Sequence, residues 1–200
     1  MDEMGYKALK VARLADRAGV HQPYLYSPGP VRLDSPAAEV MTDLKMVAAA
    51  TVDAETQIDA ANQLMIARGV RSLIVIDSRQ EVLGLVTSRD IHGERPLRAV
   101  QARGVTHGEL RVGDVMTPSR DIEVLDAADV FRADVGNILA TLKLTGRQHA
   151  LVVDKDAGGR QKVRGVFSLS QIARQLGVPI QHTELARTFA EIESALVAAV

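Results

Sequence analysis

The sequence contains no cysteine and no tryptophan among its 200 residues. The lack of cysteine excludes disulfide bonds, thiolate metal sites and a cysteine nucleophile, and it fits a reducing compartment. Only three tyrosines and three phenylalanines are present, too few for an aromatic platform that stacks single-stranded nucleic acid bases. The formal net charge is −1, so no overall basic field attracts nucleic acid or an anionic membrane surface.

Long apolar runs are missing as well. No stretch approaches the roughly 20 apolar residues of a membrane helix, and the acidic start, Met1-Asp2-Glu3-Met4, lacks the apolar core of a secretory signal. We therefore expect a cytoplasmic protein without membrane contact. Its 46% hydrophobic and 24% charged residues are ordinary for a globular chain of one sizeable domain or two small intertwined ones.

The motifs of common enzyme classes are absent too. The five histidines show none of the close pairings that bind zinc on a helix. The sequence has no Gly-x-Ser-x-Gly elbow, no Gly-Lys-Ser/Thr phosphate loop and no dinucleotide Gly-x-Gly-x-x-Gly. We expect neither an enzyme nor a bound metal nor a required cofactor.

The most informative segment that is present runs from Gly84 to Asp90. It follows the apolar run 73–76 after a short turn, so the two runs predict a β-hairpin. If Thr87 ends the second strand and Asp90 lies in the first turn of a helix, the two side chains converge. A hydroxyl and a carboxylate at that spacing suit the vicinal diol of a ribose. The alternative is that Thr87 only ends a strand and Asp90 only caps a helix.

This pattern occurs twice. The first copy contains Val40-Met41-Thr42, the segment 69–77 and Gly84-Leu85-Val86-Thr87; the second contains Val115-Met116-Thr117, the segment 146–154 and Gly165-Val166-Phe167-Ser168. The distance between matching positions grows along the chain, which we attribute to a longer, glycine-rich second hairpin turn at 155–162. Two copies predict two pseudo-symmetric halves packed against each other, whereas a solenoid needs three or more.

The order of these motifs, and their repetition over residues 36–176, resembles the cystathionine-β-synthase (CBS) domain, two copies of which form a Bateman module. The resemblance implies an α/β (α+β) fold with two pseudo-symmetric repeats, each a small sheet with two helices. We divide the chain into an extended N-terminal arm, a first repeat, a linker, a second repeat and a C-terminal amphipathic helix: 1–35, 36–95, 96–111, 112–176 and 177–200.

In this family, two clefts lie between the paired repeats, and each receives the Thr or Ser and the Asp of one motif. The resemblance therefore implies that Thr87 and Asp90 hold a ribose. The positions that match the family's base contacts, and would flank an adenine, are Ala50, Thr51, Ser72, Leu73 and Ile74. Arg71 and Arg89 are the nearest basic candidates for phosphate groups, because guanidinium pairs well with phosphate oxygens.

The second copy departs from the motif. Ser168 keeps the hydroxyl, but Gln171 stands where the acid is expected, and a neutral amide forms weaker hydrogen bonds than a carboxylate. His149 and Arg147 lie near it in the sequence and could meet an anion. We predict a weaker second site at Ser168, Gln171, His149, Ala150 and Leu151.

Apolar spacing predicts the remaining helices. One is expected at 56–68 with Gly69 as its C-terminal cap, and its counterpart at 126–144 stops at Gly146. A C-terminal helix carries an apolar stripe at Leu185, Phe189, Ile192 and Leu196. The stripe has two interpretations, packing on its own domain or contact with a second copy.

The segment 12–26 faintly resembles a helix-turn-helix. Pro23 would start its recognition helix, Pro28 would end that helix almost at once, and there is no room for a third helix, so we do not expect nucleic acid binding.

Two hypotheses from different classes remain. The first is a regulatory module that binds an adenosine-containing ligand (AMP, ADP, ATP, S-adenosylmethionine or an NAD-type molecule) and acts on an effector protein or on its own oligomeric state. The second is a structural dimerisation module without a ligand. In both we expect a homodimer. No effector domain accompanies the module in this sequence, so we expect any output to pass through another protein.

Overall fold

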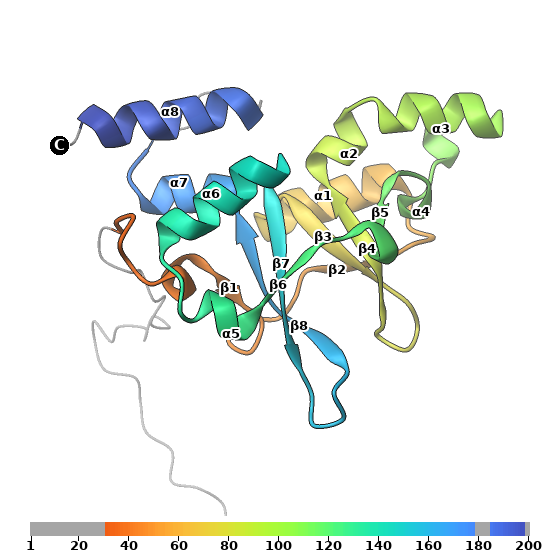
Figure 1. Ribbon diagram of the computed structural model, residues 1–200. Helices are drawn as coiled ribbons and strands as arrows, with labels where there is room; N and C mark the ends of the chain where they lie inside the picture. The colour runs from red at the N-terminus through yellow and green to blue at the C-terminus, as the bar shows by residue number, and fades with distance from the viewer. Residues whose placement is uncertain (1–30, 179–184, 199–200) are drawn as a thin grey trace, which may run out of the picture.

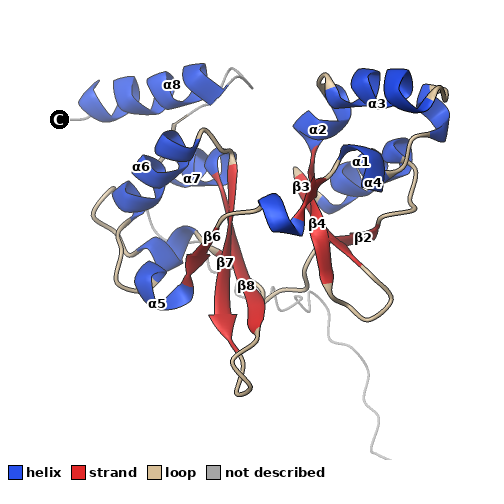
Figure 2. Cartoon of the chain, turned by 45° about the vertical axis from the view of Figure 1, so that its right-hand side comes forward, coloured by secondary structure: helices blue, strands red, loops and turns tan. Residues whose placement is uncertain are grey.

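A computed structural model describes residues 31–178 and 185–198 of the chain (Figure 1). Two four-stranded sheets lie side by side, each with its own helices, and this confirms the predicted α/β fold of two repeats. In both views the tips of the two hairpins point to the same side, away from the ends where α3 and α8 lie (Figures 1 and 2).

The first sheet has the strand order β2-β3-β4-β5. Its strands are β2 (Thr51–Asp53), β3 (Ser72–Ile76), β4 (Val82–Thr87) and β5 (Thr117–Pro118). Its helices are α1 (Ile58–Arg68), α2 (Ser88–His92), α3 (Arg95–Arg103) and α4 (Val112–Val115), with a short 3₁₀ turn η2 (His107–Glu109). The strands β2 and β3 are parallel, with α1 as the crossover, and the other pairs are antiparallel.

The second sheet repeats this plan in the order β1-β8-β7-β6. Its strands are β1 (Thr42–Asp43), β6 (Val124–Asp126), β7 (His149–Lys155) and β8 (Gln161–Ser168). The remaining elements are α5 (Ala127–Val130), α6 (Val135–Thr145), α7 (Leu169–Gln175), α8 (Leu185–Ala198), η1 (Ala37–Val40) and η3 (Ser119–Asp121).

The two halves exchange their first strands. The Met-Thr segment that opens the first repeat forms β1, which pairs with β8 of the second sheet. The Met-Thr segment of the second repeat forms β5, which pairs with β4 of the first sheet. The boundaries 36–95 and 112–176 therefore describe repeats of the sequence, whereas each folded half also contains a strand from the other repeat.

The glycine of each hairpin motif makes this exchange sterically feasible. A Cβ atom at Gly84 would lie 2.5 Å from the carbonyl oxygen of Thr117 and 2.9 Å from the sulfur of Met116. A Cβ at Gly165 would lie 2.5 Å from the sulfur of Met41. The Met-Thr and glycine motifs, which are far apart in the sequence, thus belong to the same contact.

Exchange also places core residues in the opposite half. Val112 and Val115 of the second repeat are buried in the first core, around α1 and the inner strands, beside Leu110 of the linker. Ala37, Val40 and Met41 are buried in the second core, around Phe167 and α6. A third, smaller cluster of Ile74, Leu85 and Leu151 joins the two sheets. The two halves therefore bury apolar surface jointly, which favours their folding together.

Both hairpins form as predicted. The growing distance between matching positions of the two repeats, however, has another cause than the one expected from the sequence. The β3–β4 turn is fixed by Asp77, whose side chain accepts hydrogen bonds from the backbone N–H groups of Arg79 and Glu81. Asp156 does the same for Gly158 and Arg160 in the β7–β8 turn. The turns have the same length, since Asp77 N–H donates to Glu81 and Asp156 N–H to Arg160. The prediction of a longer second turn was wrong: β7 and β8 are each two residues longer than β3 and β4.

The first amphipathic helix and both glycine caps are confirmed. The helix α1 ends at Gly69 and α6 at Gly146, with φ of 63° and 65°, values that glycine adopts without a steric penalty. The continuous helix expected at 126–144 is wrong. Asp126 caps the short α5, and Asp134 forms a capping box with Asn137 that starts α6 afresh, so local capping overrides the apolar period.

The C-terminal helix packs on its own chain. Phe189 and Ile192 are buried in the second core, and the Lys143 ammonium pairs with Glu193 between α6 and α8. These two stripe residues therefore follow the own-domain interpretation, while the side chains of Leu185 and Leu196 lie outside the described part of the structure. Most of the predicted N-terminal arm and the whole segment 12–26 also lie outside the described residues, and Val31 is buried in the second core.

Candidate functional site

The Thr87–Asp90 pair forms a capping box at the start of α2. Asp90 Oδ2 accepts hydrogen bonds from the N–H and the hydroxyl of Thr87, at 2.8 and 2.7 Å. The N–H of Asp90 donates to Thr87 Oγ1 at 3.3 Å. The capping alternative is therefore present in the structure. It fixes one carboxylate oxygen of Asp90 and leaves the other to its surroundings.

The second carboxylate oxygen is paired with an arginine that the sequence analysis did not select. Arg95 Nη1 lies 3.1 Å from Asp90 Oδ1, and the same nitrogen donates to the backbone carbonyl of Val115 at 2.7 Å. Arg95 is the first residue of α3, five positions after Asp90. The side chain of Asp90 is 14% exposed and that of Arg95 45% exposed, so the pair sits at a boundary between protein and solvent.

Thr87 and Asp90 open onto a cleft of about 760 Å³ between the two halves. A cleft of this volume can hold a nucleotide-sized ligand. It lies where β4 ends and β7 begins, which is the end of the sheets opposite the hairpin tips. The lining residues from the first half and its linker are Leu85, Thr87, Arg89, Asp90, Gly93, Glu94, Arg95 and Arg98. The other lining residues, all from the second repeat of the sequence, are Thr117, Asp121, Ile122, Glu123, Gly146, Arg147, Gln148, His149 and Leu151.

This cleft groups the predicted residues differently from the sequence analysis. Arg89 lines it beside Thr87 and Asp90, as expected, but His149 and Leu151 join them although we had placed them in the weaker second site. The positions expected to flank the base do not line it, and neither does the phosphate candidate Arg71; the base positions are Ala50, Thr51, Ser72, Leu73 and Ile74. The motif of one repeat faces the β7 strand of the other because the two sheets pack through Leu85 and Leu151.

Burial accounts for part of this difference. The side chain of Leu73 is fully buried in the first core, with Val75 and Val86. Ile74 points to the opposite face of β3 and packs in the cluster between the sheets. Thr51 pairs with Ile74 across the parallel strands, on the far side of β3 from β4. The roles assigned to these residues in ligand binding stay predictions.

The charges that line the cleft are balanced. Four arginines face four carboxylates: Arg89, Arg95, Arg98 and Arg147 against Asp90, Glu94, Asp121 and Glu123. Three of the arginines are paired, Arg95 with Asp90, Arg98 with Glu94 and Arg147 with Glu123. The exposed side chain of Arg89 has no ion pair among the described residues, so it is available to an anionic group.

His149 is the one titratable residue of the cleft that carries a large pKa shift among the described residues. Burial at the start of β7 and, to a lesser extent, the charge of Arg71 together lower its pKa from the usual 6.5 to about 4. The imidazole is therefore neutral at pH 7, with one nitrogen that donates and one that accepts a hydrogen bond. A neutral donor and acceptor pair beside Leu151 can read the edge of a heterocyclic base.

The equivalent positions of the second half have other partners. Gln171 Oε1 accepts a hydrogen bond from the hydroxyl of Thr42 at 3.2 Å, and the Ser168 hydroxyl lies 3.0 Å from that of Ser170. Ala150 packs against the second core. Gln171 thus ties the exchanged strand β1 to α7, and no side-chain cap starts that helix.

Two other functions find no support in the described residues. They hold no group of three or more histidine, aspartate or glutamate side chains placed to share a metal ion. None of their helices combines the length and the apolarity that crossing a bilayer requires.

Comparisons with known proteins agree with the architecture. Residues 37–95 match the family model described as the CBS domain. The chain is 25% identical over 145 residues to inosine-5′-monophosphate dehydrogenase of Thermoplasma acidophilum, and the match covers 72% of this chain and 28% of that enzyme. The chain thus corresponds to little more than a quarter of the length of this curated relative.

Solved structures are similar to this chain, and the first of the two that follow shows the same fold. An uncharacterized conserved protein from Pyrococcus horikoshii is 23% identical, with a TM-score of 0.53, over 76% of this chain and 100% of that one. The protein CBSX2 from Arabidopsis thaliana, solved in complex with AMP, is 22% identical with a TM-score of 0.47, over 70% of this chain and 94% of that one. Residues 37–95 therefore match the CBS domain family, and the second half of the chain repeats the same fold.

Proposed function

We propose that the cleft at Asp90 binds an adenosine-containing ligand and that the protein is a regulatory module that passes this binding on to an effector protein or to its own oligomeric state. The observation that carries the proposal is the cleft itself. It brings a carboxylate, a hydroxyl and a free guanidinium from one half to face a neutral imidazole from the other. These groups match the ribose diol, the phosphate and the base of a nucleotide.

The balance of charge in the cleft bears on the identity of the ligand. With four arginines, four carboxylates and a neutral His149, the lining has no net positive charge to attract a triphosphate. We therefore propose a ligand with one phosphate group or a neutral 5′ substituent, such as AMP, in preference to ATP. AMP is the first probe to use.

Thermal unfolding of the full chain tests ligand binding directly. At 100 times its dissociation constant, AMP should stabilise the folded state by about 2.7 kcal/mol, which corresponds to a rise in melting temperature of about 5–10 °C for a chain of this size. The competing hypothesis is a dimerisation module that binds no ligand, and one observation favours it: both carboxylate oxygens of Asp90 already have partners. A set of adenosine compounds that leaves the melting temperature unchanged at millimolar concentration would support that hypothesis instead.

Titration calorimetry of matched variants locates the site. Asp90→Asn keeps an acceptor for the capping box but removes the charge, so AMP binding should weaken about tenfold or more. Gln171→Ala, at the equivalent position of the second half, should leave it nearly unchanged. The reverse result would place the ligand in the other cleft.

We also propose that the chain forms a homodimer, although Phe189 and Ile192 are buried in their own chain and offer it no surface. Light scattering at micromolar concentration should give twice the chain mass of 21.6 kDa. A monomer mass under these conditions would contradict the proposal.

A further inference from the structure

Asp90 has too few free acceptor positions to bind a ribose diol in the state described here. A carboxylate offers about four lone-pair positions to donors. Thr87 occupies two of them, both on Oδ2, through its N–H and its hydroxyl, and the guanidinium of Arg95 lies 3.1 Å from Oδ1 as an ion pair. The 2′ and 3′ hydroxyls of a ribose supply two donors, and the oxygen left for them is the one that this guanidinium covers. A ligand that uses both hydroxyls must therefore displace one of the existing partners.

Arg95 is the partner that a ligand can displace most easily. The contacts of Thr87 belong to the capping box that starts α2, so breaking them would disturb the helix. The side chain of Arg95 is 45% exposed, and water can solvate its charge once it leaves Asp90. The same Nη1 donates to the carbonyl of Val115 at 2.7 Å, so a guanidinium that leaves Asp90 gives up this hydrogen bond as well.

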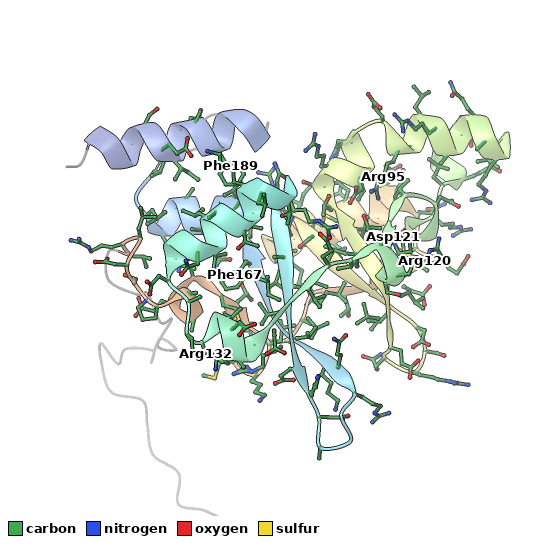
Figure 3. All side chains as sticks on the ribbon, viewed as in Figure 1. Arg95, Arg120, Asp121, Arg132, Phe167 and Phe189 are labelled. Atoms are coloured by element: carbon green, nitrogen blue, oxygen red, sulfur yellow. The ribbon has the colours of Figure 1, made fainter. Side chains whose placement is uncertain are left out.

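The chain between the two residues keeps Arg95 over the cleft. Gly93 makes the turn from α2 to α3, with its N–H bonded to the carbonyl of Arg89 at 2.8 Å. A Cβ at this position would lie 2.6 Å from that carbonyl oxygen, so the tight turn requires glycine. Figure 3 shows Arg95 on the side of the first half where Asp121 also lies, and both residues line the cleft. A displaced guanidinium therefore stays within the cleft.

We infer that Arg95 determines which nucleosides this cleft accepts: it competes with the ribose for Asp90, and a 5′-phosphate compensates for the displaced ion pair by binding the released guanidinium. This inference rests on the proposed adenosine site and adds to it a residue that selects for the phosphate. A guanidinium pairs with phosphate oxygens through two parallel hydrogen bonds, which a nucleoside without phosphate cannot provide.

Calorimetric titration of Arg95→Gln with adenosine and with AMP tests the inference, because the two probes should respond in opposite directions. Adenosine should bind about two- to fivefold more tightly, since the competing ion pair is gone. AMP should bind about tenfold more weakly, since the phosphate loses its partner. Arg95→Lys keeps the charge but not the paired donors, so its loss of AMP affinity should be smaller.

Arg103→Gln is the matched control. Arg103 lies on the same helix, but it pairs with Asp114 and does not line the cleft. The variant loses one positive charge, as Arg95→Gln does, but it removes no competitor for Asp90, so the affinity for adenosine should stay unchanged. A gain for adenosine in Arg103→Gln, or an Arg95→Gln variant in which the affinities for both probes change in the same direction or not at all, would overturn the inference alone. Wild-type protein that binds neither probe would overturn the proposed function, and the inference with it.

Discussion

The two halves of the molecule share one fold and treat the same motif position in opposite ways. In the first half Asp90 closes a capping box and turns its second oxygen toward a cleft. In the second half Gln171 reaches across to Thr42, on the strand exchanged from the other repeat. One side chain serves a candidate binding site and the other serves the connection between the halves. Duplication of a fold therefore leaves each copy free to keep or to lose a polar site, as long as its core is preserved.

The hairpins give the complementary lesson, because here the two halves agree. Asp77 and Asp156 accept the same pair of backbone N–H bonds in turns of equal length. The third position after each aspartate has a positive φ, at Gln80 in the first turn and at Gly159 in the second. The turns are preserved because a side-chain acceptor fixes them locally, whatever the length of the strands they join.

The largest expected difference between the halves concerns their cores. Phe167 and Val86 occupy equivalent strand positions, and both are fully buried. Phe167→Ala should lower the free energy of unfolding by about 3–5 kcal/mol, because it removes a large side chain and leaves a cavity. Val86→Ala should cost about 2 kcal/mol, since only two methylene equivalents are lost. Urea unfolding measures both; equal losses would show that the second core relaxes around the missing ring.

A second comparison concerns the two strand-exchange contacts. Gly84→Ala brings a Cβ to 2.5 Å from the backbone carbonyl of Thr117, which cannot move without disturbing β5. Gly165→Ala meets the side chain of Met41 at the same distance, and a flexible methionine can adjust. We expect a loss of about 1–3 kcal/mol for the first variant and a smaller loss for the second. Urea unfolding with the reverse order would mean that the β1 contact is the more rigid one.

The next comparison uses pH, because His149 occupies the position that Ser72 holds in the first half. Its folded pKa of about 4 lies below its usual value of 6.5, so the unfolded chain binds more protons between these values. The contribution of His149 to the free energy of unfolding is therefore fully present above pH 6.5. It is lost as the pH falls toward 4, and the loss is about 1–2 kcal/mol at pH 5.

The variant His149→Ser copies the first half and should remove this part of the acid sensitivity, as urea unfolding at pH 5 and pH 7 would show. The other charged residues around the cleft, Arg71, Arg147, Asp121 and Glu123, remain in both proteins and cancel in the comparison. An unchanged difference between pH 5 and pH 7 in the variant would contradict the assignment.

The smallest expected effect lies in the turns. Gln80 has φ of 64°, a left-handed value that costs a residue with a side chain about 1 kcal/mol. Gln80→Gly copies the second turn and should change stability by less than that, because relief of strain is offset by the greater freedom of glycine in the unfolded chain. Gly159→Gln copies the first turn and should be destabilising. Thermal unfolding that shows Gly159→Gln to be neutral would mean that this turn adapts its backbone.

Local sequence patterns predicted the local structure well. The apolar runs before Asp77 and Asp154 formed the hairpins, and Gly69 and Gly146 formed the helix caps, since each of these depends on a few neighbouring residues. The continuous helix expected at 126–144 does not form, and the reason is local. Asp134 and Asn137 form a capping box that starts a new helix, and the spacing of apolar residues gives no information about such caps. The candidate site was predicted only in part. Thr87, Arg89 and Asp90 adjoin in sequence, whereas Arg95 could have been found only from the glycine turn that follows the motif.

The sequence by itself determined the repeat, the hairpins with their aspartate turns, and the Thr87–Asp90 box, because hydrogen bonds between near neighbours and the alternation of apolar residues specify them. The tertiary structure alone decided that the halves exchange strands, that His149 faces Asp90 and that Arg95 occupies its second oxygen. These features depend on how two apolar sheet faces pack against each other through Ile74, Leu85 and Leu151. Packing of that kind brings together residues whose separation along the chain carries no signal of their contact.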